Sequence, residues 1–194
     1  SSIKKSKILS ELKIDKQEYF LGSIHREENV DSPEKLKDIV SSLNIITEHF
    51  KRKLILALHP RTKLRIEEQK LKFGPNIVDL KPMGFFDYVW LQQNSFCVIS
   101  DSGTIFEESS ILKFPAITIR DAHERSEAMD EGTVIVSSLN KKEIITSINV
   151  AIDQYKTNPP SIPLDYNSEQ VSWKVLKVIL SYKDYINKKV WFKN

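Results

Sequence analysis

The chain has 194 residues, of which 40% are apolar and 28% charged, and its formal net charge is +3. This composition indicates an ordinary soluble domain with one sizeable core, and the small net charge does not favour nucleic acid as a partner. No stretch has the roughly 20 apolar residues of a membrane helix, and the first residues do not resemble a signal peptide. The single cysteine, Cys97, excludes a disulfide framework and a thiolate metal cluster within the chain. We expect a buried thiol in a reducing, cytoplasmic protein.

Short apolar runs alternate with segments of helical period, which predicts βαβ units and a mostly parallel sheet. The residues up to Ile14 are expected to form a helix. Strands are predicted at residues 19–24, 54–58, 76–80, 96–100, 116–119 and 133–136. Helices are predicted near residues 33–50, 62–72, 85–94, 103–113 and 124–130, with two longer helices near 140–157 and 168–186.

The segment NPPSIP separates the last two predicted helices. Proline lacks an amide donor and restricts the residue before it, so this segment is the best candidate for a linker. The expected fold is therefore α/β, with a Rossmann-like parallel sheet and helices on both faces over residues 1–160, followed by a helical tail at 161–194.

Four loops that follow predicted strands carry clusters of polar residues. They are HREEN (25–29), HPRT (59–62), DSGT (101–104) and RDAHER (120–125). Ligands of open α/β sheets bind at the carboxyl ends of the strands, and this set of side chains suits a phosphorylated, hydroxylated ligand. The chain has no compact metal-ligand spacing, no GxGxxG and no GxxxxGK[ST], which argues against a metal enzyme, an ordinary dinucleotide site and a P-loop.

The segment SDSGTIFEESS contains the start of a predicted helix. If Ser102 lies near the N-cap, the amides of Gly103 and Thr104 point outward, where the helix dipole favours an anion. Glu108 follows Thr104 by four residues, on the same face, and one carboxylate can accept from two ribose hydroxyls. Glu107 follows Gly103 at the same interval, so spacing does not choose between the two glutamates. A capped, solvated helix would explain the same residues.

Three histidines lie in the polar loops. His25 directly follows a predicted buried strand, where an imidazole can carry protons or donate to a phosphate, or can simply be satisfied by a backbone carbonyl. The residues leave both possibilities open. His59, which precedes Pro60, is expected to have a structural role or to contact the ligand-binding side chains without touching the ligand. The chemistry of His123 does not decide between a functional and a structural role.

Taken in order, HREEN, HPRT, PMGFFDYVWL, SDSGTIFEE and RDAHERSEAMDEGT resemble the C-terminal half of the non-hydrolysing UDP-N-acetylglucosamine 2-epimerases, from about residue 8 to 136. The resemblance implies the C-terminal domain of a glycosyltransferase-B-type fold, which holds UDP while the sugar lies between two domains. It implies elimination of UDP to a 2-acetamidoglycal and re-addition with inversion at C2, with no cofactor and no essential metal. Most acids and bases of that reaction lie in the N-terminal domain, which this chain is expected to lack.

The resemblance also implies roles for residues. It makes His25 the catalytic residue of this half, in contact with the substrate near the reacting sugar or the diphosphate. It assigns the diphosphate to Ser102, Gly103 and Thr104 at the helix start, and the ribose to Glu108.

Further residues are assigned to the two ends of the nucleotide. Arg125 is expected at the phosphate end and Tyr88 near the uracil, and Met83 stands where many members have Gln, so the backbone would contact the uracil edge. The sequence also departs from the family pattern at Thr104, usually a glycine, and at Ser126, usually a proline. Four residues are expected to contact the ligand-binding side chains without touching the ligand, namely Arg26, Glu28, His59 and Asp101.

The segments HREENVD, AHER with MDEGT, and SYKDYINKKVWFK resemble the branch that acts on UDP-2-acetamido-2,6-dideoxy-L-talose, a route to UDP-N-acetyl-L-fucosamine for bacterial capsules and lipopolysaccharide O-antigens. Expected partners are UDP, a UDP-2-acetamido sugar and the protein's own N-terminal domain, in a homodimer, with residues 161–194 packed across the domain junction. No nucleic acid or membrane partner is expected. A glycosyltransferase-type domain and a non-catalytic nucleotide-sugar binding domain remain as alternatives.

Overall fold

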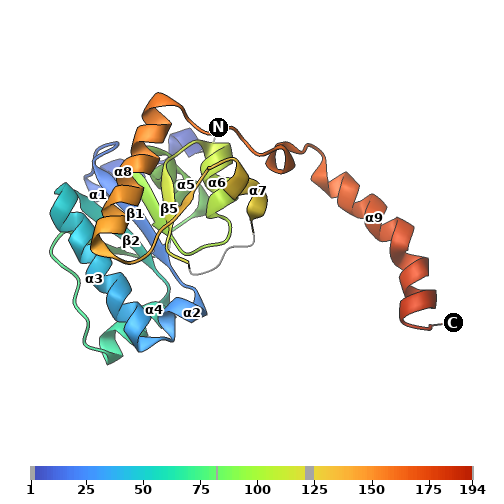
Figure 1. Cartoon of the computed structure of the whole chain (residues 1–194), viewed down its shortest axis with the longest axis horizontal. Helices are drawn as coiled ribbons and strands as arrows, with labels where there is room; N and C mark the ends of the chain where they lie inside the picture. Colours follow the sequence, from blue (N-terminus) through green and yellow to red (C-terminus); the bar gives the residue numbers. More distant parts are fainter. Residues whose placement is uncertain (1–2, 82, 121–124, 194) are drawn as a thin grey trace. The chain divides into compact units, whose positions relative to one another are not determined.

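The computed structural model describes residues 3–81, 83–120 and 125–193 (Figure 1). The chain divides into two compact units, Ser1–Pro163 and Leu164–Asn194, and the division falls at the end of the NPPSIP segment. Among the described residues, no helix is both long enough and apolar enough to cross a membrane.

The first unit is built on a parallel sheet. Its order is β3-β2-β1-β4-β5-β6, counted over the described residues. The strands are β1 Tyr19–Ile24, β2 Lys53–Leu58, β3 Ile77–Leu80, β4 Cys97–Ser100, β5 Ala116–Thr118 and β6 Ile135–Val136. The predicted strands and the predicted α/β class are thus confirmed, although β6 is shorter than expected. The strand order reverses between β1 and β4, and such a reversal opens a crevice at the carboxyl ends of the strands, where ligands bind.

The helices of this unit mostly match the predicted ranges. They are α1 Ile8–Leu12, α2 Glu27–Val30, α3 Pro33–Phe50, α4 Pro60–Glu68, α5 Phe85–Asn94, α6 Ile105–Leu112, α7 Ser126–Asp130 and α8 Lys141–Thr157. The N-terminal segment is a 3-10 turn followed by the short α1, because Lys13 adopts a left-handed conformation (φ 52°) and ends that helix. The single turn α2, inside HREEN, was not predicted, since four residues are too few to show a helical period.

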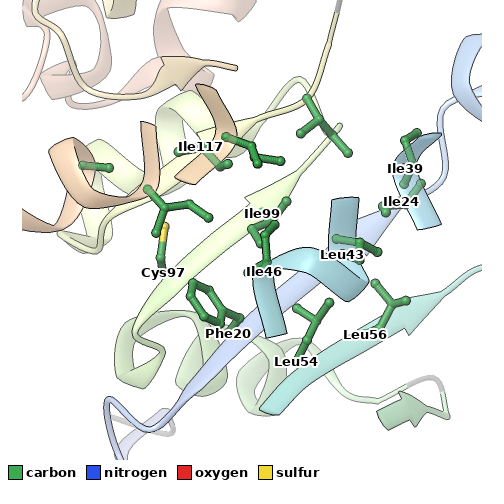
Figure 2. Close-up of a cluster of buried hydrophobic side chains, with 14 of the residues drawn as sticks. Phe20, Ile24, Ile39, Leu43, Ile46, Leu54, Leu56, Cys97, Ile99 and Ile117 are labelled. Carbon is green, nitrogen blue, oxygen red and sulfur yellow. The ribbon is translucent and has the colours of Figure 1, made fainter. Parts of the chain in front are cut away.

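The apolar core lies between the sheet and helices α3 and α8 (Figure 2). Phe20 of β1 and Cys97 of β4 are both fully buried in it, and burial raises the pKa of the Cys97 thiol. On the opposite face of the sheet, the hydroxyl of Tyr19 donates to the carbonyl of Leu91 in α5 at 2.7 Å. Helices therefore cover both faces, as predicted, and the carboxyl edge of the sheet is left for the polar loops.

The second unit is helical. It contains a 3-10 turn (Leu164–Asn167), α9 (Val171–Tyr185) and a π-helical turn (Ile186–Val190). No residue of α9 is buried, and Trp173 and Leu180 are 61% and 65% exposed. Large apolar side chains along so much of a helix are typical of a segment that packs against a partner surface.

Candidate functional site

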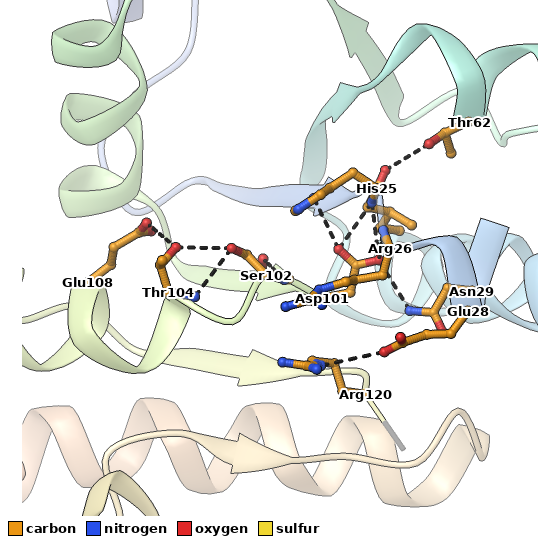
Figure 3. Close-up of polar contacts among 12 residues, drawn as sticks. His25, Arg26, Glu28, Asn29, Thr62, Asp101, Ser102, Thr104, Glu108 and Arg120 are labelled. Atoms are coloured by element: carbon orange, nitrogen blue, oxygen red, sulfur yellow. Dashed lines mark hydrogen bonds and ion pairs between the residues drawn. The ribbon is translucent and has the colours of Figure 1, made fainter. Parts of the chain in front are cut away.

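The loops after β1 and β4 are joined by a buried carboxylate (Figure 3). Asp101 directly follows β4 and has no exposed surface. It accepts from the backbone N–H of His25, at 3.1 Å to each oxygen, and from that of Arg26 at 2.9 Å. The side-chain amide of Asn29 donates to it at 3.2 Å. Asp101 therefore fixes the backbone of the HREEN loop, and its predicted role behind a substrate site stays a prediction.

The imidazole of His25 lies beside the same carboxylate. Its Nδ1 is 3.2 Å from Oδ1 of Asp101, and the His25 side chain is 44% exposed. His25 also lines a cavity of about 290 Å³, formed by the last residues of β1, β2 and β3, by residues that follow these strands and by Tyr88 of α5. A ring that is held on one side and open on the other can exchange a proton with a bound molecule.

Three more of the predicted site residues line this cavity, namely His59, Met83 and Tyr88. His59 is the N-cap of α4, where its Nδ1 accepts from the backbone N–H of Arg61 at 3.2 Å. Because this bond satisfies an amide of the first helical turn, His59 has a structural role as well as a place in the cavity wall.

The phenol of Tyr88 lies in the cavity wall, within the influence of charges on the loop after β4 and on α6. Burial raises the pKa of Tyr88 to about 12, opposed by a hydrogen bond with Ser23 and assisted by the negative charges of Glu108 and Asp101. Tyr88 therefore keeps its proton at neutral pH and can donate a hydrogen bond.

The DSGT loop leads into α6, whose N-cap residue is Thr104, two positions after Ser102. Ser102 lies in the preceding turn, with its Oγ 3.0 Å from the Thr104 hydroxyl and 3.4 Å from the Thr104 amide nitrogen. The Thr104 hydroxyl donates to Oε1 of Glu108 at 2.7 Å. Ser102, Thr104 and Glu108 thus form a continuous row of polar groups along the start of α6 (Figure 3).

The two adjacent glutamates of α6 have different partners. Glu108 accepts through Oε2 from the side-chain amide of Gln92 at 2.5 Å. Glu107 accepts from Nε of Arg125 at 2.8 Å. The structure therefore brings Glu108 toward the Thr104 row, whereas Glu107 holds Arg125. Gln92 is buried in α5 and was not predicted as a site residue, because nothing in its local sequence marks it.

Two arginines converge at Gly103. A Cβ atom added to Gly103 would lie 3.0 Å from Nη2 of Arg26 and 3.5 Å from Nη1 of Arg120. Arg120 follows β5 and is only 7% exposed. Its Nε is 3.7 Å from Oε1 of Glu28, and among the described residues this nitrogen has no hydrogen-bond partner. Two guanidinium groups beside a helix start form a strong site for an anion.

Arg120 lies in the RDAHER segment but was not among the predicted site residues. The available signal was its position, because it lies two residues after the buried strand β5, at the same sheet edge as Asp101. Other residues of that motif, including His123, lie outside the described residues. In the described parts of the chain, no group of three or more His, Cys, Asp or Glu side chains has a metal-binding arrangement.

Known proteins with a similar sequence and fold identify the family of this chain. The family model described as UDP-N-acetylglucosamine 2-epimerase matches residues 1–180. A UDP-N-acetylglucosamine 2-epimerase structure from Rickettsia bellii is 42% identical, with a TM-score of 0.84 over 99% of this chain and 52% of that one. The enzyme of Methanocaldococcus jannaschii in complex with UDP-GlcNAc and UDP is 32% identical, with a TM-score of 0.78 over 93% of this chain and 50% of that one.

A further relative is named for a different UDP-sugar from that of the two solved structures. The UDP-2,3-diacetamido-2,3-dideoxy-D-glucuronate 2-epimerase of Pseudomonas aeruginosa is 33% identical over 134 residues, which are 69% of this chain and 37% of the relative. The chain spans about half the length of the solved structures and less than half of this relative. With a family model that matches most of its length, the chain belongs to the UDP-N-acetylglucosamine 2-epimerase family, as its motifs predicted.

Proposed function

We propose that this chain is the UDP-binding half of an epimerase that inverts C2 of a UDP-2-acetamido sugar. The observation that carries the proposal is the convergence of Arg26 and Arg120 on Gly103, beside the start of α6. A diphosphate needs several donors and positive charges at once, and glycine lets it approach the backbone closely. Arg120 is buried and incompletely paired within the described residues, so an anionic ligand would complete its hydrogen bonding.

The position of the diphosphate indicates where the ribose and the uracil of UDP would bind. Glu108 lies one helical turn beyond Thr104, and its carboxylate accepts from hydroxyl groups, as it does from Thr104 itself. A ribose diol suits this acceptor. The part of the cavity lined by Met83 and Tyr88, away from His25, would then take the uracil.

His25 would act at the reacting end. The reaction breaks the bond between C1 and the diphosphate oxygen together with the C2–H bond, and the reverse step restores both with the hydrogen on the opposite face. His25 lies close to the Gly103 loop because Asp101 binds both its backbone and its ring. In this position an imidazole can donate a hydrogen bond or a proton to the departing diphosphate. The base at C2 would come from the N-terminal half.

The second unit has a role in the same proposal. The exposed apolar residues of α9 and the turn after it, among them Trp173 and Trp191, would pack against the N-terminal half of the enzyme. The homodimer, the L-talose to L-fucosamine sugar pair and the role in bacterial surface polysaccharides stay predictions from the motifs.

Titration calorimetry with UDP, ADP and UDP-N-acetylglucosamine tests the proposal. UDP is expected to bind, and ADP is expected to bind at least about tenfold more weakly, because the proposed contacts to the uracil edge are not available to a purine. A glycosyltransferase-type domain would bind UDP too, so product analysis in the complete protein, with and without an acceptor, separates the two functions. Equal affinity for UDP and ADP would contradict the proposed nucleotide site.

A further inference from the structure

Asp101 contacts His25 in two separate ways. Its carboxylate accepts three backbone or amide hydrogen bonds, from His25, Arg26 and Asn29. It also lies beside the imidazole, with Oδ1 3.2 Å from Nδ1. The backbone bonds alone would hold the loop, so the contact with the ring needs its own explanation. A carboxylate with no exposed surface, surrounded by N–H donors, offers only acceptor oxygens to its neighbours.

We propose that Asp101 is a positioning residue that holds His25 in the tautomer with hydrogen on Nδ1, so that Nε2 faces the cavity with a free lone pair. With a lone pair on Nδ1, two electron-rich atoms would face each other at 3.2 Å, whereas an Nδ1–H group is attracted to the carboxylate. The position of one ring hydrogen decides which nitrogen of a histidine can take a proton.

The surroundings of the ring are consistent with this tautomer. The other side of His25 faces a cavity whose wall includes His59, Lys81 and Tyr88. Tyr88 keeps its phenolic hydrogen, and a lysine side chain such as that of Lys81 offers no acceptor, so the wall contains hydrogen-bond donors. A lone pair on Nε2 suits a wall that contains donors. The consequence for catalysis rests on the proposed function: His25 takes a proton from solvent at Nε2 and delivers it to the diphosphate oxygen as the C1–O bond breaks.

Nitrogen-15 NMR of the whole chain tests the proposal directly. Long-range proton–nitrogen spectra, recorded near pH 8, above the usual imidazole pKa of about 6.5, show which ring nitrogen carries the hydrogen. Loss of signals in His25→Asn identifies the ring. We expect Nδ1–H in the parent chain. In Asp101→Asn, the amide oxygen keeps the backbone N–H donors while its NH2 group faces Nδ1, so the tautomer should reverse to Nε2–H.

Asp153→Asn, at an exposed position of α8, is the matched control and should leave the tautomer unchanged. An Nε2–H tautomer or an even mixture in the parent would overturn the proposal, and so would an unchanged tautomer in folded Asp101→Asn. If Asp101→Asn does not fold, the parent spectrum decides. UDP titration of the same samples separates the two proposals, because absent UDP binding with an intact Nδ1–H tautomer would contradict the proposed function alone.

Discussion

Thr104 and Glu108 lie one turn apart at the start of α6, and the Thr104 hydroxyl donates to Oε1 of Glu108 at 2.7 Å. Gln92 donates to the other carboxylate oxygen. The Glu108 carboxylate is therefore held in a fixed orientation by two neighbours, one from its own helix and one from α5. Fixed orientation matters because a preorganised acceptor loses little side-chain entropy when a diol binds.

Glu108→Gln should weaken UDP binding by about 1.5–3 kcal/mol, the usual range for a hydrogen bond to a charged group. It should also remove the preference for UDP over 2′-deoxy-UDP, because the lost bonds are those to the ribose. Glu107→Gln is the matched control, since Glu107 is paired with Arg125 instead. Calorimetry with both nucleotides measures the effect. A larger loss of UDP affinity in the Glu107 variant than in the Glu108 variant would show that the ribose is not bound by Glu108.

Gly103→Ala tests the anion site without removing a charge. The added Cβ would lie 3.0 Å from Nη2 of Arg26, so this guanidinium must move. Since the arginine end is flexible, the unfolding temperature should change little, while UDP affinity should fall about tenfold or more through one displaced charged contact. Gly74→Ala, at the opposite end of the sheet, brings a Cβ to 3.4 Å from Oδ1 of Asn44 and should leave UDP affinity unchanged. Equal affinities of the two variants would argue against the site.

Arg120→Met should separate binding from stability. Arg120 is a nearly buried charge whose Nε lacks a hydrogen-bond partner among the described residues, and its contact with Glu28 is long. Replacing such a charge by an apolar side chain of similar length is often neutral or stabilising. We therefore expect an unfolding free energy equal to or above that of the parent, with UDP binding weakened at least about tenfold. Urea unfolding and calorimetry measure the two quantities, and a large loss of stability would make Arg120 a structural residue.

The sequence predicts the first and last residues of an element correctly where capping residues or apolar patterns nearby in the chain mark them. Helix α3 runs from Pro33 to Phe50 as expected, because Ser32 caps it, Pro33 occupies the first turn and apolar residues recur at helical spacing. Strand β1 was also predicted to the residue, since its apolar run is bounded by polar loops. Such features are determined within a few residues of the chain.

The arrangement of the site depended on contacts that local sequence does not contain. Arg120 reaches Gly103 because β4 and β5 pair in one register, Ser100 beside Thr118, which brings the following loops together. The different partners of Glu107 and Glu108 likewise come from other elements, α5 and the segment before α7. Sequence could therefore indicate which loops form the site, but not which side chains meet within it.

The pKa of Tyr88 predicts loss of stability at alkaline pH. Its folded pKa is about 12, whereas an exposed tyrosine titrates near 10. The unfolded chain therefore releases this proton first, so the stability from the neutral phenol is complete below about pH 10 and is lost as pH rises toward 12.

Tyr88→Phe should reduce the slope of unfolding free energy against pH in that window, by at most about 1.4 kcal/mol per pH unit. Tyr182→Phe, on exposed α9, is the control. An unchanged slope in Tyr88→Phe would contradict burial of the phenol.

The 194-residue chain alone should bind UDP and yet fail to epimerise a UDP-sugar. Removal of hydrogen from C2 needs a positioned base and a site closed to water, and the described ligand loops lie along one sheet edge, which can enclose only one side of the sugar. The measurement is deuterium incorporation at C2 in deuterated water, followed by mass spectrometry.

Adding the N-terminal half of a family member should restore exchange and shift the fluorescence of Trp173 and Trp191 to shorter wavelength, as these exposed rings become buried. Deuterium incorporation by the chain alone would instead mean that a group of this half, such as Glu28, removes the C2 proton itself.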